Sequence, residues 1–451
     1  MNYSKRTILR FAFGVISGLV SGNAFASKRE NLQGKNIIVI GAGISGLVAA
    51  NMLQNRGAEV LVLEARSQPG GRTRTSMHLG APFEIGAGWI HGPSPDNPIR
   101  QLADNADSSF FITNDDSIAL YTTDGSEIEE DDWDEIEEIW EEIIYDKIDN
   151  NSKGSILDVI NEYDSNIWSD PNIRWVFSAY EEFNYGGPVQ EISAGLINKM
   201  SSFPTADVIF KDGYDKIINL LAKNLQIETN SIVKSVNYSS TNKITVSTTS
   251  KNYECDYVIC SVPLGVLKSN SIEFNPELPK YLQDSIENVG FGTVTKLALK
   301  FKDQFWDSDV QYYYTVAKET GRWPVWMNYR TFSKEKILMG LCMGNYAKKA
   351  DFMSNEELIE ETGTYVNKIK NFKKILKYFI LNTYLEYINK TIYNSIQTNI
   401  ETANKWAKKY GFQKKNQDKL KYPLHTLYSK NALGGLHCMQ RQEVKRGRGG
   451  R

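Results

Sequence analysis

The fold of this chain is decided by one continuous stretch, Asn36-Ile37-Ile38-Val39-Ile40-Gly41-Ala42-Gly43-Ile44-Ser45-Gly46. Its first five residues form an apolar, β-branched run, typical of a strand buried on both faces of a parallel sheet. The run enters a GxGxxG pattern directly, and apolar residues then recur at helical spacing until Gly57, where the helix is expected to end. A second apolar strand, residues 60–63, ends at Glu64. This order predicts a Rossmann-like domain that binds a dinucleotide.

The residues of this unit have distinct physical tasks. Gly41 permits the tight turn, Gly43 lets the backbone approach a pyrophosphate, and Gly46 lets the helix pack closely on the strand. Amide groups at the helix start, including those of Ile44 and Ser45, have no partner within the helix. Together with the helix dipole, they favour a bound diphosphate.

Glu64 restricts which dinucleotide is expected. Its carboxylate can accept hydrogen bonds from the hydroxyl groups of the adenosine ribose. The same negative charge would repel the additional phosphate of NADP. The unit therefore argues against NADP as the dinucleotide.

Two later segments point to a family. They are Ala65-Arg66-Ser67-Gln68-Pro69-Gly70-Gly71-Arg72 and Phe83-Glu84-Ile85-Gly86-Ala87-Gly88-Trp89-Ile90-His91-Gly92. In this order they resemble the FAD-dependent amine oxidase family of the polyamine and monoamine oxidase type. The resemblance implies that FAD binds, with the GGR backbone and its arginine at the pyrophosphate. The residues that it assigns to FAD in the first segment are Ala65, Arg66, Gly70, Gly71 and Arg72.

The second segment has a role by its chemistry as well. The small residues Gly86, Ala87 and Gly88 would allow a flat ring to approach the backbone, and Trp89 can form a wall. The resemblance places this segment beside the isoalloxazine ring. His91 follows, either as a surface-loop histidine or, as in family members with a W-I-H-G sequence, as a substrate-pocket group that favours polyamines.

Further segments extend the resemblance to about residues 35–345. In the family, the residue that matches Val233 contacts adenine through its backbone. Residues 257–267 match the family's strand and turn with the sequence V-x-P-L-G-V-L.

Lys296 is the best catalytic candidate, in the alternating strand pattern of residues 292–301. The pattern alone favours a solvated strand lysine. The resemblance to the family's T-K-hydrophobic-x-L-x-F strand favours catalysis, because the equivalent lysine there holds a water at flavin N5. A desolvated lysine can also exchange protons near neutral pH. Trp326 is a candidate aromatic wall for an amine, with an ordinary core tryptophan as the alternative.

Composition and charge give no sign of a nucleic-acid partner or a metal site. The net charge of −2 gives no indication of a nucleic-acid partner, and the four histidines show no metal-ligand spacing, so no metal site is expected. Flavin chemistry needs neither a metal nor a triad. The acidic run at residues 131–140 predicts an amphipathic helix with a solvated acidic face, or alternatively a surface that concentrates a polycationic substrate.

The N-terminus is typical of an export signal. Basic residues at positions 5–10 precede a short apolar run, 11–20, and a small-x-small cleavage site, 24–26. The run is too short to span a membrane. We therefore expect a bacterial periplasmic or secreted protein without a transmembrane helix. The start also resembles a twin-arginine signal with Lys5 in place of the first arginine.

The resemblance stops after about Phe372. The family's later G-x-E turn and closing H-G-A…S-G helix have no counterpart in residues 373–451, which are rich in Lys, Asn, Tyr and Ile. A frameshifted or truncated reading frame explains such a change for an exported protein, and a different tail is the alternative. A frameshift would remove a portion of the flavin site.

We predict an α/β fold in which a mixed α+β substrate domain is inserted into a Rossmann-like FAD-binding domain. A signal peptide (1–26) is expected to precede the first FAD-binding segment (27–105). A helical, acidic segment of the substrate domain (106–199) follows, and then the second FAD-binding segment (200–268). The remaining substrate-domain segment (269–372) leads into a basic tail (373–451).

The resemblance implies oxidation of a primary or secondary amine, with polyamines among the candidates. Hydride would pass to flavin N5, and O2 would be reduced to H2O2. One alternative is a flavin desaturase or dehydrogenase, which shares the GxGxxG and GGR patterns but lacks the lysine strand and the P-L-G-V-L turn. The other is a degenerate flavoprotein without activity.

Overall fold

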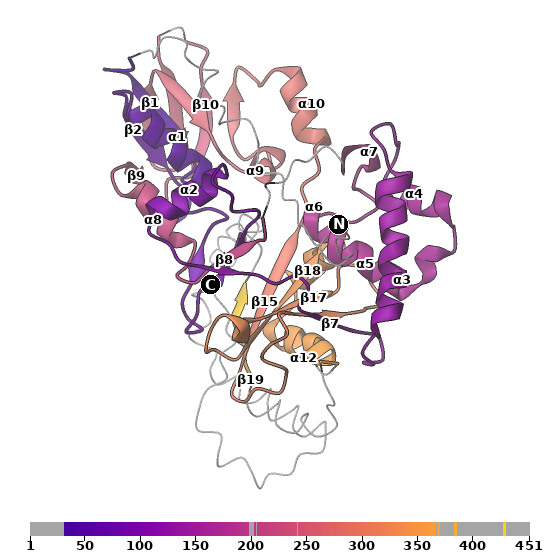
Figure 1. Ribbon diagram of the computed structural model, residues 1–451. Helices are drawn as coiled ribbons and strands as arrows, with labels where there is room; N and C mark the ends of the chain where they lie inside the picture. The colour runs from indigo at the N-terminus through magenta and orange to yellow at the C-terminus, as the bar shows by residue number, and fades with distance from the viewer. Residues whose placement is uncertain are drawn as a thin grey trace, which may run out of the picture.

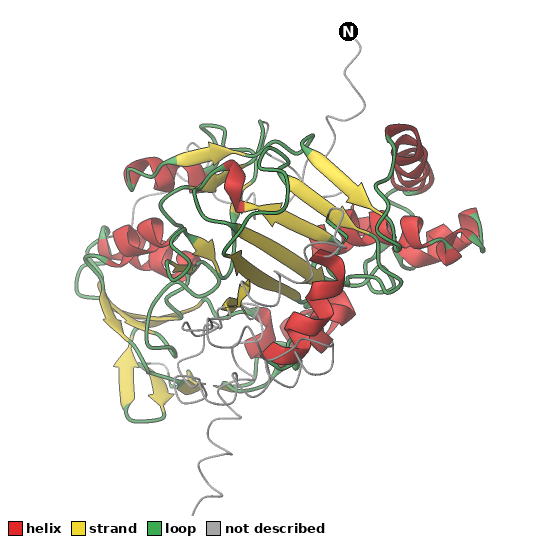
Figure 2. Ribbon diagram, turned by 90° about the horizontal axis from the view of Figure 1, so that it is seen from below, coloured by secondary structure: helices red, strands yellow, loops and turns green. Residues whose placement is uncertain are grey.

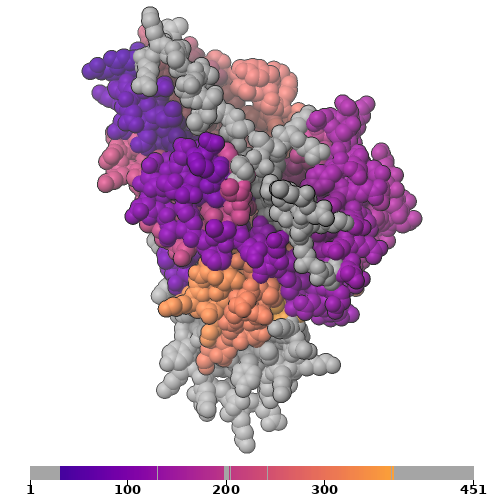
Figure 3. Space-filling view, in the orientation of Figure 1, coloured from indigo at the N-terminus to yellow at the C-terminus, as the bar shows by residue number. Residues whose placement is uncertain are grey.

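The computed structural model describes residues 31–197, 203, 205–240, 242–366, 368–369, 383–385 and 427–429. The predicted signal peptide lies outside these residues. The described chain forms a nucleotide-binding region with α1 and β1, a broad sheet that contains β15, and a helical region that contains α3 (Figure 1). In the space-filling view, residues near position 100 lie between the N-terminal region and the orange segment near residue 340 (Figure 3).

A four-stranded parallel sheet carries the glycine pattern. Its strands lie in the order β13 (Tyr257–Cys260), β1 (Asn36–Ile40), β2 (Glu59–Leu63) and β9 (Gln226–Glu228). β1 lies between two partners, and Ile37 to Ile40 are buried, as the apolar run predicts. The helices of this region are α1 (Ile44–Gln54), α2 (Pro98–Asn105) and α8 (Asp215–Ala222). The Rossmann-like fold is therefore present, assembled from two distant stretches of sequence.

A second sheet packs against the first. It contains β12 (Asn252–Cys255), β11 (Ile244–Thr248), β10 (Val233–Asn237) and β14 (Glu273–Asn275). Ile38, Ile40 and Leu63 of the first sheet share a core with Val236 and Val246 of the second. The short helices α9 (Leu264–Lys268) and α10 (Lys280–Asn288) follow at the same end.

The largest sheet runs through the middle of the molecule (Figure 2). The buried side chains on its two faces belong to different hydrophobic cores. Its path is β19 (Thr383–Leu385), β15 (Val294–Phe301), β18 (Ile337–Met343), β17 (Val325–Asn328), β16 (Tyr312–Thr315) and β7 (Ile118–Tyr121), and β20 (Leu427–Ser429) also pairs with β15. Two strands of the predicted tail thus pair with β15. The face opposite the helical region packs on α11 (Gly344–Ala350) and α12 (Asn355–Val366).

The helical region covers the other face of this sheet. Its helices are α3 (Glu130–Glu141), α4 (Ile156–Tyr163), α5 (Pro171–Phe177), α6 (Phe183–Tyr185) and α7 (Ala194–Ile197), with π-helical turns at Glu142–Lys147 and Ser178–Glu182. Trp133, Ile136 and Trp140 of α3 are buried, whereas Asp131, Asp132 and Glu135 are exposed. The predicted amphipathic helix is confirmed.

Two small sheets connect these regions. One pairs β3 (Thr75–Ser76) with β4 (Phe83–Glu84), and the other contains β5 (Trp89–Ile90), β8 (Val208–Phe210) and β6 (Phe110–Ile112). They bring the segment around residues 83–92 against β15, where the candidate site lies.

Candidate active site

The glycine turn at the start of α1 has the geometry that a diphosphate needs. Gly41 has φ +102°, and a Cβ on Gly46 would lie 2.1 Å from the Gly41 carbonyl oxygen. A Cβ on Gly43 would meet no atom within 4 Å, so the backbone there is open to a ligand. No side chain caps α1, which leaves the amides of Ile44 and Ser45 for that ligand.

Glu64, which follows the end of β2, stabilises the glycine turn by hydrogen bonds. Its side chain is buried, and its carboxylate accepts hydrogen bonds from the Ala42 amide at 2.7 Å and the Arg66 amide at 2.9 Å. A carboxylate has about four acceptor positions, so capacity remains for ribose hydroxyls. Glu64 therefore has a structural task in addition to the predicted binding task.

The second glycine segment packs against the first. The Gly70 amide donates to the Ala42 carbonyl at 2.9 Å, and a Cβ on Gly71 would lie 3.3 Å from the Gly43 Cα. Arg66 donates to the Gly71 carbonyl at 3.1 Å. These contacts place the two segments together, as the resemblance implies for a pyrophosphate site.

Arg72 and Val233 complete the predicted nucleotide site. Among the described residues, the Arg72 guanidinium has no hydrogen-bond or ion-pair partner, so it is available to an anion. Val233 begins β10, close to Glu64, because the Ser231 amide donates to the Glu64 carbonyl at 2.8 Å. An open glycine turn, an uncapped helix start and an unpaired arginine fit a dinucleotide.

Residues 86–89 pass from the nucleotide region to β15. A Cβ on Gly86 would lie 1.7 Å from the Arg72 carbonyl oxygen, and the Ala87 amide donates to that oxygen at 2.9 Å. A Cβ on Gly88 would lie 3.2 Å from Lys296 Nζ. Glycine is therefore required at 86 and leaves room for the lysine at 88.

Lys296 points at this segment and away from solvent. It is 7% exposed, and its Nζ donates to the carbonyls of Gly86 at 2.5 Å and Glu84 at 3.2 Å. The same Nζ lies 5.5 Å from the centroid of the Trp89 ring. Burial lowers the pKa of Lys296 to about 8, and the nearby Glu84 charge opposes that shift. The lysine is thus a buried group near residues 86–89, which we call the ring-facing segment because the family resemblance implies that they lie beside the isoalloxazine ring.

A cavity of about 20 Å³ adjoins Lys296. Its lining includes Gly88, Trp89, Tyr329 and Met339. This volume is enough for about one water molecule. The cavity therefore allows a water beside the lysine ammonium.

His91 is held by a carboxylate. Its Nδ1 lies 2.6 Å from Asp207 Oδ2, while Asp207 Oδ1 accepts from the Gly92 amide at 3.0 Å. The His91 ring stacks beside Trp89, with centroids 6.5 Å apart. His91 is therefore adjacent to the site, which fits the pocket interpretation better than a free surface loop.

A second acidic group lies near Trp89. Trp89 Nε1 donates to the Tyr312 hydroxyl at 3.3 Å, and Tyr312 also interacts with Asp115. Burial, and then the nearby Asp207 charge, raise the pKa of Asp115 to about 7. Local sequence carries no signal for Asp115 or Asp207, because each joins the site only through tertiary pairing.

Trp326 is not a member of this site, which corrects the aromatic-wall interpretation. Leu297 pairs with Gly340, which pairs with Trp326, so Trp326 lies on the face opposite Lys296. It is fully buried, and its Nε1 donates to the Trp323 carbonyl at 3.1 Å. Trp326 is a core residue packed over Gly340.

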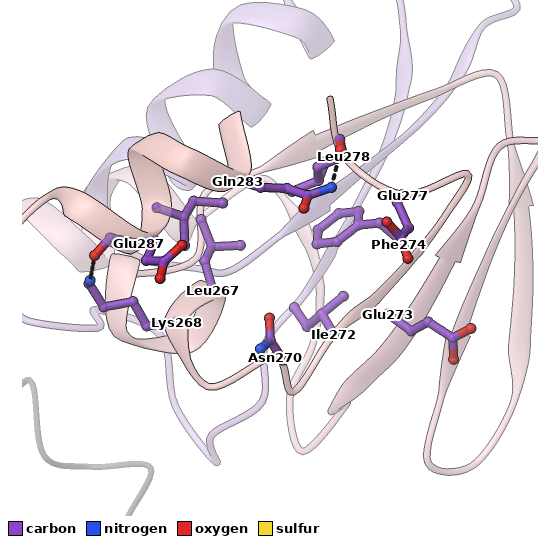
Figure 4. A pocket seen from close by; sticks show the side chains of 11 residues that line it. Leu267, Lys268, Asn270, Ile272, Glu273, Phe274, Glu277, Leu278, Gln283 and Glu287 are labelled. Carbon is purple, nitrogen blue, oxygen red and sulfur yellow. Dashed lines mark hydrogen bonds between the residues drawn. The ribbon is translucent and has the colours of Figure 1, made fainter. Parts of the chain in front are cut away.

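A wider groove of about 930 Å³ lies elsewhere, among α9, β14 and α10 (Figure 4). Lys268 donates to the Glu287 carbonyl and Gln283 to the Leu278 carbonyl, each at 2.6 Å. These polar groups join neighbouring segments and do not converge on a common point. We therefore place the candidate active site at the cavity beside Lys296 and not in this groove.

No described helix combines the length and apolar character needed to cross a membrane. The described ranges also contain no group of three or more His, Cys, Asp or Glu placed to hold a metal ion.

Sequence comparison places these features in a family. Residues 169–375 match the flavin-containing amine oxidoreductase model, and residues 39–106 match an NAD(P)-binding Rossmann-like domain. The first match ends close to Phe372, where the resemblance stops.

Curated relatives agree with both matches. The chain is 30% identical to probable polyamine oxidase 4 of Arabidopsis thaliana, over 73% of this chain and 70% of the relative. It is 27% identical to polyamine oxidase 3 of Oryza sativa subsp. japonica, over 76% of each. It is 28% identical to lysine-specific histone demethylase 1 homolog 1 of Arabidopsis thaliana, over 73% of this chain and 42% of that protein. The chain belongs to the flavin-containing amine oxidoreductase family and is an FAD-dependent amine oxidase.

Proposed function

We propose that this chain oxidises a polyamine at the carbon beside an amine nitrogen, giving an imine and hydrogen peroxide. The overall change is R–CH2–NH–R′ + O2 → R–CH=N–R′ + H2O2. When bound, FAD supplies the oxidant that accepts hydride from this carbon. The observation that carries the proposal is Lys296, buried beside Gly86, Gly88 and Trp89 with space for one water.

Lys296 has the properties of a group that holds that water. Its ammonium already donates to two carbonyls and has a third proton to donate. Its lowered pKa, caused by burial, lets it exchange a proton near neutral pH. The substrate nitrogen must lose its proton before oxidation, and Lys296 in its neutral form can accept that proton.

The substrate side favours a cation with more than one nitrogen. The His91–Asp207 pair and Asp115 bring two carboxyl groups to the neighbourhood of Trp89. The faces of Trp89 and Tyr312 can pack against alkyl segments and ammonium groups. Polyamine oxidases among the relatives support the same substrate class.

The test is purification of the full chain, followed by a visible spectrum and a peroxide assay. Spermidine, spermine, benzylamine and an amino acid are supplied separately. We expect flavin absorbance and peroxide release that is fastest with the polyamines. Bound flavin that is reduced by substrate without peroxide would favour the desaturase or dehydrogenase alternative. Protein that stays colourless after refolding with FAD would favour a degenerate flavoprotein.

A further inference from the structure

Glu84 is a buried carboxylate that the proposed chemistry does not use. It is 6% exposed and belongs to β4, two residues before Gly86. Its Oε1 accepts from the Tyr214 amide at 2.9 Å, and its Oε2 accepts from the Thr75 hydroxyl at 2.8 Å. Burying a charged carboxylate costs free energy unless hydrogen bonds and an opposite charge compensate it.

The two partners of Glu84 anchor it to the nucleotide region. Thr75 lies opposite Glu84 in the β3–β4 pair. The Thr75 amide donates to Asp215 Oδ1 at 3.0 Å, and the Asp215 amide donates to Thr75 Oγ1 at 3.1 Å. The position of Glu84 is therefore fixed from α8 as well as from β3.

The backbone at Glu84 and Gly86 accepts hydrogen bonds from Lys296. The carbonyls of Glu84 and Gly86 are the two acceptors of Lys296 Nζ. Because the Glu84 side chain is held at Tyr214 and Thr75, both carbonyls are held in the direction of β15. One residue thus sets the position of the lysine and places a negative charge near it.

We propose that Glu84 is the positioning residue of Lys296, which orients the lysine ammonium toward the ring-facing segment and maintains its positive charge. The inference rests on the proposed function, because it concerns the lysine assigned there to the reaction. Glu84 acts through Lys296 and not through contact with substrate.

The electrostatics agree with this geometry. Burial raises the pKa of Glu84, and the hydrogen bonds from Tyr214 and Thr75 and the charge of Lys296 oppose that shift. The Glu84 charge raises the pKa of Lys296 against the effect of burial. The other titratable groups that face Glu84 are Asp215, Tyr214 and Tyr329. Of the described groups that act on the pKa of Glu84, Lys296 is the one with a positive charge.

The test follows the charge of Lys296 directly. The full chain is labelled with 13C at lysine Cε, and the Lys296 signal is assigned by its absence in Lys296→Met. The signal is then titrated with pH in wild type and in Glu84→Gln. The Glu84 charge raises the pKa of Lys296. We therefore expect the midpoint to fall by about one pH unit in Glu84→Gln, the lower end of the shift that a nearby opposite charge causes. Glu84→Asp, which keeps the charge, should restore most of that change.

The matched control is Glu335→Gln. Glu335 Oε2 lies 2.5 Å from Lys300 Nζ, and Lys300 lies on β15 four residues after Lys296, on the same face. This variant removes a carboxylate from a neighbouring lysine, and the Lys296 midpoint should stay at its wild-type value. If Glu84→Gln does not fold, Thr75→Val removes one hydrogen bond of the carboxylate and should lower the midpoint by a smaller amount.

The outcomes separate this inference from the proposed function. An unchanged Lys296 midpoint in Glu84→Gln, or an equal change in Glu335→Gln, contradicts the positioning role. In FAD-loaded protein, the alkaline limb of flavin reoxidation should move with the Lys296 midpoint. If Glu84→Gln shifts the titration midpoint of Lys296 but leaves the alkaline limb of the reoxidation pH profile unchanged, the positioning role of Glu84 is upheld. The proposed role of Lys296 in the reaction is then contradicted.

Discussion

The Nζ of Lys296 lies 2.5 Å from the carbonyl oxygen of Gly86, and this contact joins the middle of β15 to the ring-facing segment across 210 residues. Gly88 leaves room for this contact, because a Cβ there would lie 3.2 Å from the same nitrogen and would crowd it. A lysine that strand alternation alone would place in solvent is therefore enclosed by the nucleotide region.

Replacing Glu64 should weaken FAD binding. Glu64→Ala leaves the buried Ala42 amide and the half-buried Arg66 amide without their acceptor, and hydrogen bonds to charged groups are worth about 1.5–3 kcal/mol. Roughly 10- to 100-fold weaker binding is expected, and Glu64→Arg should be worse. Flavin retained per mole of protein measures the effect. Glu59→Ala, at the exposed start of the same strand, is the control, and equal flavin content in all variants would refute the role of Glu64.

Replacing Asp207 should weaken substrate binding more than turnover. Asp207→Asn removes the charge held 2.6 Å from His91 and keeps an acceptor for Gly92. We expect KM for a polyamine to rise by roughly tenfold, the lower end for a charged hydrogen bond. Steady-state kinetics with spermidine and with benzylamine measure this. The control is Asp212→Asn, which breaks a surface ion pair with Lys216, and a similar KM in both variants contradicts the assignment.

The buried Glu84 should make stability fall as pH rises. Burial raises the pKa of Glu84 to about 7 from 4.5. Between these values the unfolded chain releases this proton before the folded chain does, so stability is lost with rising pH. The free energy of unfolding of Glu84→Gln, measured relative to that of wild type, should therefore rise by on the order of 3 kcal/mol between pH 4.5 and pH 8. Urea unfolding at both pH values measures the difference, and a pH-independent difference contradicts the prediction.

Export is a separate prediction, carried by residues that the structure does not describe. The basic start and the small-x-small site at residues 24–26 predict cleavage before Ser27. Expression in a bacterial host should give extracytoplasmic protein with Ser27 as its first residue. N-terminal sequencing decides this, and an intact Met1 on cytoplasmic protein contradicts it.

The nucleotide site could be predicted because its signals are local. Strand, glycine turn, helix and acid follow one another within residues 36–64, and each constrains the backbone by itself. The packing of Gly71 on Gly43 then follows from the order of the two segments.

The substrate side could not be predicted in the same way. Period-two alternation separates the faces of a strand without telling which face receives the site. The aromatic-wall interpretation of Trp326 is wrong for this reason, whereas Lys296 is identified only through its resemblance to the family. Asp207 reaches His91 across 116 residues, a separation that no local pattern reveals. Glu84 does carry a signal, as an acid within an apolar, glycine-rich segment.

The central claim, that Lys296 serves the flavin reaction, is tested most directly by stopped-flow measurement of Lys296→Met. The change keeps the length of the side chain and removes its charge and donors, so flavin should remain bound. Reoxidation of reduced flavin by O2 should slow by roughly 100- to 1000-fold, the typical effect of losing one fixed electrostatic group in a low-dielectric site. Lys300→Met, on the same strand and face, is the control and should react at the wild-type rate. If reduction and reoxidation of Lys296→Met both stay within about twofold of wild type, Lys296 has no role in the reaction.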